Sequence, residues 1–154
     1  MTLVWRLTRR IHATPPTRAF DGVGAELRGG RWNKIGTRAA FASSTRSLAA
    51  LEYLAHVDPE RLPADLVFAG AALDDDAIQT SALPDDWDVV GSASAAEFGD
   101  RWLRRRRRLA LSVPSVIIRA ERNYVINPLH PDAEHLRVQP TLEPFSFDDR
   151  LIRR

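Results

Sequence analysis

The sequence predicts an α+β fold: a single domain with a mostly antiparallel sheet and flanking helices. A chain of 154 residues that is 44% hydrophobic has the size of one domain and can bury a real core. Short apolar runs typical of strands are mixed with two main helical patterns, without the βαβ alternation of a parallel sheet. No repeat or low-complexity linker divides the chain. We therefore expect one domain over residues 1–154.

The N-terminal half of the chain begins with an alternating pattern in residues 3–8, which predicts a strand. The short apolar run of residues 39–43 predicts a buried strand. A helix is expected next, over residues 46–56, with Ser44 or Thr45 as its N-cap. A further strand is expected over residues 65–73, closed by three consecutive aspartates.

The C-terminal half starts with a mixed region, residues 77–93. A second helix is expected over residues 95–111, ended by Pro114, followed by a strand over residues 115–119. The remaining elements are short: a strand or turn at 123–127, a helical turn at 131–135, and strands at 136–138 and 144–147.

Composition excludes several functional classes. The absence of cysteine excludes disulfide scaffolds, thiol catalysis and cysteine-ligated zinc. The four histidines lack zincin spacing, so we expect no metal. No run approaches the ~18 apolar residues of a membrane span, and the N-terminal segment lacks the pattern of a signal peptide. We therefore expect a cytoplasmic protein with no membrane partner.

The basic charge is carried almost entirely by arginine, and the formal net charge is only +2. Residues 104–108 are five consecutive arginines. On a helix they point in every direction, so a solvated helix is expected, and no direct contact with nucleic acid. The alternative is a site for nucleic acid or an acidic partner.

A glycine pair, Gly29 and Gly30, leads directly into Arg31 and Trp32. Glycine allows close approach of the backbone to a ligand, and arginine grips phosphate or carboxylate through two parallel hydrogen bonds. This combination is typical of a pocket for an anionic, ring-bearing molecule. The alternative is a turn that opens a strand, with Trp32 in the core and Arg31 in solvent.

Glu52 is the most informative acid, because it shares a helical face with Leu48, Leu51 and Ala55. Its carboxylate either extends to water from the edge of the apolar stripe or is buried and paired, with Arg31 as a candidate partner. Ser115 follows Pro114, where its hydroxyl could hold a substrate or simply form a turn. Without a Gly-x-Ser-x-Gly motif it is a poor candidate for a nucleophile.

Two asparagines, Asn123 and Asn127, lie in a block that continues to Asp132. Asn127 precedes Pro128, which is a turn signal. Near a pocket, the two amides could instead hydrogen-bond a carboxamide or ribose hydroxyls.

The segments around Arg31, Glu52 and Ser115 resemble those of the RES-domain family, which is named for an Arg, a Glu and a Ser. The matching blocks run in order over nearly the whole chain: residues 30–36, 41–44 with 48–52, 113–115, 121–132 and 144–151. Each block is weak alone, and five in register are specific. Position 41 departs from the pattern, since it is commonly Tyr in the family and is Phe41 here.

The resemblance implies a fold like that of ADP-ribosyltransferases and a toxin of a bacterial type II toxin–antitoxin pair. Such toxins take NAD as substrate, with no further cofactor, and hydrolyse it, phosphorolyse it or transfer its ADP-ribose to a protein. The implied partner is a helix-turn-helix antitoxin, and a homodimer is also considered. It further implies that Arg31, Glu52 and Ser115 are catalytic. The residues implied to bind NAD are Arg31, Trp32, Phe41, Asn123 and Asn127.

Phe41 keeps a ring that could stack on nicotinamide or adenine but lacks the hydroxyl of tyrosine. This substitution and the arginine run leave a catalytically weak binding module as the alternative function. A nucleotide-binding protein of unrelated fold is disfavoured, because neither a P-loop nor a Gly-x-Gly-x-x-Gly motif is present.

Overall fold

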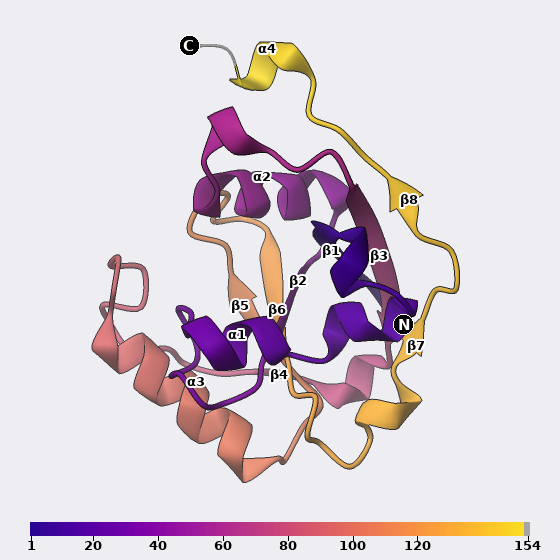
Figure 1. Cartoon of the computed structure of the whole chain (residues 1–154). Helices are drawn as coiled ribbons and strands as arrows, with labels where there is room; N and C mark the ends of the chain where they lie inside the picture. The colour runs from indigo at the N-terminus through magenta and orange to yellow at the C-terminus, as the bar shows by residue number, and fades with distance from the viewer. Residues whose placement is uncertain (153–154) are drawn as a thin grey trace.

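Eight strands form one curled sheet in the computed structural model, which describes residues 1–152 (Figure 1). The strand order is β4-β5-β6-β2-β1-β3-β7, and β8 also pairs with β3. Every pair is antiparallel except β4 with β5, which confirms the expected α+β fold and its mostly antiparallel sheet. The strands are β1 (Thr2–Arg9), β2 (Ala40–Ser43), β3 (Leu66–Leu73), β4 (Ile78–Thr80), β5 (Ala110–Pro114), β6 (Arg122–Ile126), β7 (Arg137–Val138) and β8 (Glu143–Pro144).

The sheet consists of two halves that meet at a narrow seam. Strands β1 and β2 are paired through a single register position, Trp5 opposite Ser43, whereas β1 and β3 pair over their whole length. Helix α2 lies over one half and helix α3 over the other (Figure 1). The helices are α1 (Val23–Arg28), α2 (Arg46–His56), α3 (Ala93–Arg105) and α4 (Asp149–Ile152).

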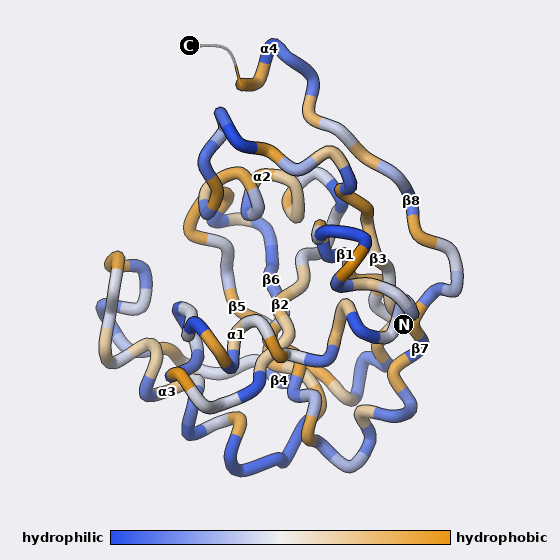
Figure 2. The backbone as a smooth tube through the Cα atoms, viewed as in Figure 1, coloured by the Kyte–Doolittle hydropathy of each residue, from blue (hydrophilic) through white to orange (hydrophobic). Residues whose placement is uncertain are grey.

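Three apolar clusters follow from the alternation of side chains along the strands. The inner cluster joins the two halves, with Val4 and Ala69 on one side and Ala42 and Ile126 on the other. On the outer faces, α3 packs over β5 and β6, and α2 packs over β1 and β3. Polar residues gather on the loops around these strands (Figure 2).

The strands expected at residues 3–8, 39–43 and 65–73 and the helix at 46–56 are confirmed. Thr45 is the N-cap, because its hydroxyl oxygen accepts the Leu48 N–H at 3.0 Å. Of the described residues, none belongs to a helix long and apolar enough to cross a membrane.

The helix expected over residues 95–111 is wrong at its C-terminal end. It ends at Arg105, and Arg106 adopts a left-handed conformation with φ of 50°. The Leu103 carbonyl accepts hydrogen bonds from the Arg106 N–H and from the Asn127 side-chain amide. Residues 109–111, which looked like the last helical turn, instead run into buried strand β5.

The strand expected over residues 115–119 is also wrong, because Ser115 follows β5 rather than starting a strand. The Ser115 hydroxyl oxygen accepts the N–H groups of Ile117 and Ile118, each at 3.0 Å, and this bends the chain into a turn. The two isoleucines, whose β-branched side chains suggested a strand, are 40% and 37% exposed.

Candidate functional site

The site is centred on the carboxylate of Glu52, halfway along α2. Oxygen Oε1 of Glu52 accepts a hydrogen bond from Ser115 Oγ at 2.8 Å and one from Asn123 Nδ2 at 2.7 Å. Within residues 1–152, no hydrogen bond is made to the second oxygen, Oε2. Helix α2, the turn after β5 and strand β6 therefore bring three of the expected site residues together and leave one carboxylate oxygen available.

The orientation of Asn123 is set by its neighbour on β2. The register of β2 and β6 places Ser43 opposite Asn123, and Ser43 Oγ donates to Asn123 Oδ1 at 2.7 Å. Because the amide oxygen is occupied, the amide nitrogen faces Glu52. Ser43 is 4% exposed, so this hydrogen-bond chain is shielded from water on one side.

Ser115 has no hydrogen-bonding capacity left for a ligand. Its hydroxyl donates to Glu52 and accepts from two backbone N–H groups, and the residue is 0% exposed. In this structure Ser115 holds the Glu52 carboxylate and shapes the turn that follows.

Arg31 lies at the tip of a tight turn closed by the bridge between Gly30 and Asn33. Its Nη1 donates to the carbonyl oxygens of Trp87 at 2.7 Å and Val89 at 3.1 Å. No hydrogen bond or ion pair joins Arg31 to Glu52 in the part of the chain that the structure describes, so the expected pairing is not formed. The reason is that each group has other partners: loop carbonyls hold Arg31, and Ser115 and Asn123 hold Glu52.

Helix α3 fixes this turn through a close backbone contact. A Cβ at Gly99 would lie 2.0 Å from the Trp32 carbonyl oxygen, so only glycine fits there. The neighbouring Asp100 is 4% exposed, accepts the Lys34 N–H at 3.1 Å and pairs with Arg104 at 3.0 Å. Neither Gly99 nor Asp100 was predicted from the sequence as a site residue.

Trp32 is a core residue. It is 5% exposed and stacks on Trp87, with ring centroids 6.1 Å apart. The alternative interpretation of the glycine–arginine segment, which places Trp32 in the core, is therefore correct for this residue. Phe41 is half-buried on β2, and its ring lies against Gly30, where an added Cβ would be 3.2 Å from Cε2. Phe41 is thus the aromatic side chain beside the Arg31 turn.

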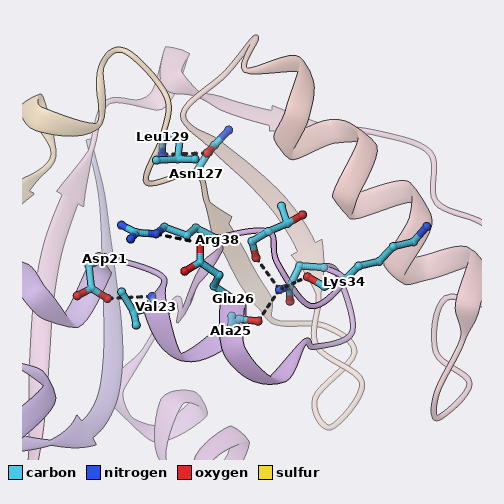
Figure 3. Close-up of polar contacts among 10 residues, drawn as sticks. Asp21, Val23, Ala25, Glu26, Lys34, Arg38, Asn127 and Leu129 are labelled. Atoms are coloured by element: carbon cyan, nitrogen blue, oxygen red, sulfur yellow. Dashed lines mark hydrogen bonds and ion pairs between the residues drawn. The ribbon is translucent and has the colours of Figure 1, made fainter.

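Hydrogen bonds tie α1 to the loop that follows the Arg31 turn (Figure 3). The buried Asn33 amide nitrogen donates to the carbonyls of Ala25, Lys34 and Thr37. Arg38 pairs with Glu26 at 3.2 Å (Figure 3).

Asn127 does not join the Glu52 cluster in this structure. It is 2% exposed, its Nδ2 donates to the Leu103 carbonyl at 2.7 Å, and its Oδ1 accepts the Leu129 N–H at 3.1 Å (Figure 3). Both ends of the amide are bound to backbone, which makes Asn127 a cap for α3.

Sequence reasoning missed Arg6, which lies at the seam between the two halves of the sheet. This half-buried side chain on β1 donates from Nη1 to the Phe41 carbonyl at 2.9 Å. Burial lowers the pKa of Arg6, and the charge of Asp21 partly opposes that effect. The available signal was a charged residue between the apolar positions of a predicted strand.

A hollow of about 420 Å³ lies between the loop after β4 and the β5–β6 hairpin. It adjoins the site at Trp87, whose carbonyl holds Arg31, and at Pro114, which precedes Ser115. Residues 1–152 contain no group of three or more acidic or histidine side chains arranged to hold a metal ion. The hollow is lined by Thr80, Ser81, Leu83, Pro84, Asp85, Trp87, Pro114 and Arg122.

Comparisons with known proteins identify the family of the chain. The chain is similar to the Prs ADP-ribosylating toxin of Sphingobium sp. (strain YBL2), with 32% identity covering 99% of this chain and 98% of that protein. It is also similar to Toxin Res of Photorhabdus laumondii subsp. laumondii, with 33% identity covering 98% and 97%.

A crystal structure of the M. tuberculosis MbcT–MbcA toxin–antitoxin complex shares the fold, with a TM-score of 0.63. That likeness covers 98% of this chain and 86% of the other at 14% identity. The sequence model of the RES domain matches residues 3–148. The chain therefore belongs to the RES-domain family.

Proposed function

We propose that this protein is the toxin of a toxin–antitoxin pair and that it cleaves NAD at the bond between nicotinamide and ribose. The observation that carries the proposal is the Glu52 carboxylate, held through one oxygen by Ser115 and Asn123 while the other oxygen is free of hydrogen bonds to residues 1–152. The names of the relatives, Toxin Res and Prs ADP-ribosylating toxin, support a toxin that consumes NAD.

Cleavage of this bond develops positive charge on the ribose as nicotinamide leaves. A fixed carboxylate stabilises such a charge without having to reorganise, and pre-organised electrostatic stabilisation is usually the largest single contribution to catalysis. In the proposal, Oε2 of Glu52 bonds the ribose hydroxyls, offsets the developing charge and orients the attacking acceptor. Ser115 and Asn123 keep that oxygen in place.

Arg31 is the proposed clamp for the pyrophosphate. Its Nη1 is anchored to the loop carbonyls, and its other N–H groups make no hydrogen bond to any described residue. Phe41 provides an aromatic wall beside the turn. Arg6, whose guanidinium contacts the Phe41 backbone, is the second cation proposed to face an anionic substrate.

The antitoxin is proposed as a helix-turn-helix protein that covers this site. Support for an antitoxin partner comes from a structural neighbour, which is part of a toxin–antitoxin complex. The cytoplasm is the proposed compartment, because NAD is available there.

Analysis of the products formed from NAD tests the proposal. Purified protein is incubated with NAD, with and without phosphate, and with a cell extract and labelled NAD to detect transfer to a protein. We expect release of nicotinamide, and the fate of ADP-ribose distinguishes water, phosphate and protein as the acceptor. The name of the Sphingobium relative is the reason for including the protein acceptor.

Glu52→Gln keeps the size and hydrogen bonding of the side chain and removes its charge, so we expect turnover to fall by at least about 100-fold with little change in folding. The matched control is Glu134→Gln, which changes an exposed glutamate in the same way. This variant should turn over NAD at the wild-type rate. Intact NAD under all three conditions would refute the proposed activity, and full turnover by Glu52→Gln would remove Glu52 from the chemistry.

A further inference from the structure

The candidate site has two halves, Glu52 with Ser115 and Asn123 on one side and Arg31 on the other. Among the described residues, no hydrogen bond or ion pair joins the two halves directly. They are connected through two loops. The turn after β5 begins at Ser115 and carries Arg119, and the loop after β4 carries Trp87, Asp88 and Val89.

An ion pair joins these loops. Arg119 Nη2 lies 2.8 Å from Asp88 Oδ2, and the Arg119 guanidinium lies 5.7 Å from the centre of the Trp87 ring. The same short segment accepts the two hydrogen bonds from Arg31, through the carbonyls on either side of Asp88. Residues 87–89 are therefore held between two arginines from different parts of the chain.

Electrostatics favour this arrangement. The pKa of Asp88 is lowered mainly by its hydrogen bond to Arg119, with a smaller contribution from the charge of Arg31. The ionised Asp88 carboxylate is therefore favoured by both arginines. Its side chain is 29% exposed, so its charge is only partly screened by water.

We infer that Arg119 and Asp88 are a positioning pair that sets the Arg31 clamp relative to the Glu52 carboxylate. The inference rests on the proposed function. Glu52 is bonded to Ser115, whose hydroxyl holds the backbone of the turn that carries Arg119. Arg119 bonds Asp88, whose neighbours hold Arg31. A dinucleotide can contact both Arg31 and Glu52 only if these two side chains are already held at the correct distance from each other.

The alternative interpretation is that Arg119 and Asp88 form a surface ion pair without functional consequence, since Arg119 is 62% exposed. The two interpretations differ in what the variants change. Loss of an exposed pair leaves the melting temperature within about 4 °C of the wild type in either case. Only a positioning pair also lowers kcat/KM for NAD.

The experiment is a double-mutant cycle on the whole chain with Arg119→Met, Asp88→Asn and the double variant, using NAD turnover and thermal unfolding. We expect each single variant to lower kcat/KM by about 5- to 10-fold, with a raised KM, and the double variant to be no worse than either. Arg119→Lys, which keeps the charge, should recover at least half of the lost activity.

The matched control is Arg9→Met. Arg9 forms a similar exposed ion pair with Asp65, at 3.0 Å, in the other half of the sheet and also lowers the pKa of its partner. Three outcomes would each overturn the inference. The single variants could turn over NAD like the wild type, their effects could multiply in the double variant, or Arg9→Met could lose as much activity as they do. If the wild type itself leaves NAD intact, the proposed function fails instead.

Discussion

The Glu52 and Arg31 halves of the site are built by different kinds of contact. Glu52 is held by side chains: a buried serine hydroxyl and an asparagine amide that is itself oriented by a second serine. Arg31 is held by backbone: loop carbonyls bind its guanidinium, and α3 lies directly against the carbonyl of its neighbour Trp32.

This difference in contacts determines whether a mutation in each half of the site affects activity or folding first. A hydrogen-bonded side chain can be replaced by a smaller one with little steric consequence, so changes around Glu52 should affect activity more than folding. A backbone contact has no side chain to give way, so changes at the Arg31 turn should affect folding first.

The largest expected effect is at Gly99. Alanine there would place a Cβ 2.0 Å from the Trp32 carbonyl oxygen, and neither backbone can move without unpacking α3. We expect Gly99→Ala to lower the free energy of unfolding by more than about 3 kcal/mol, measured by denaturant titration.

Gly24 provides the control for Gly99. It lies inside helix α1, and an added Cβ there meets nothing within 4 Å. Gly24→Ala should raise stability by about 0.5–1 kcal/mol, because alanine is the better helix former. If the two alanine variants were equally stable, the backbone contact would not hold the Arg31 turn.

An intermediate effect is expected at Ser115. Alanine removes the hydrogen bond to Glu52 and leaves two turn N–H groups without their acceptor. We expect Ser115→Ala to reduce kcat for NAD by about 10- to 100-fold and to cost about 2 kcal/mol of stability.

Ser81→Ala is the matched control for Ser115, since the Ser81 hydroxyl bonds the carbonyl of its neighbour Ala82 outside the Glu52 cluster. It should match the wild type in both measurements. A Ser115→Ala variant that kept full kcat would show that Glu52 does not depend on side-chain support, which would remove the distinction between the two halves.

The same distinction explains what the sequence could predict. Periodicity located helix α2 and strand β1, because burial on one face leaves a repeating pattern, and short apolar runs located strands β2 and β3. Residue type and family resemblance identified Glu52, Ser115 and Asn123, which the structure brings together.

Contacts made by backbone left no such signal. The fit of Gly99 against Trp32 and the carbonyls that hold Arg31 depend on tertiary position rather than on residue type. Ile117 and Ile118 suggested a strand, but a single hydroxyl redirects their backbone. Leu109 and Leu111 extended the apparent helical pattern, although α3 had already ended at Arg105.

The smallest expected effect is at Arg106, which follows the last residue of α3 and has φ of 50°. This conformation is strained for any residue with a Cβ and suits glycine. Arg106→Gly should therefore raise the free energy of unfolding by about 0.5–1 kcal/mol, whereas Arg105→Gly, one residue earlier and helical, should lower it by up to about 1 kcal/mol. Because α3 holds the Arg31 half through Gly99 and Asp100 rather than through the arginine run, NAD turnover should be unchanged in both variants. A loss of turnover in Arg106→Gly without a loss of stability would mean that the charge of the arginine run, and not only the backbone of α3, supports the Arg31 half.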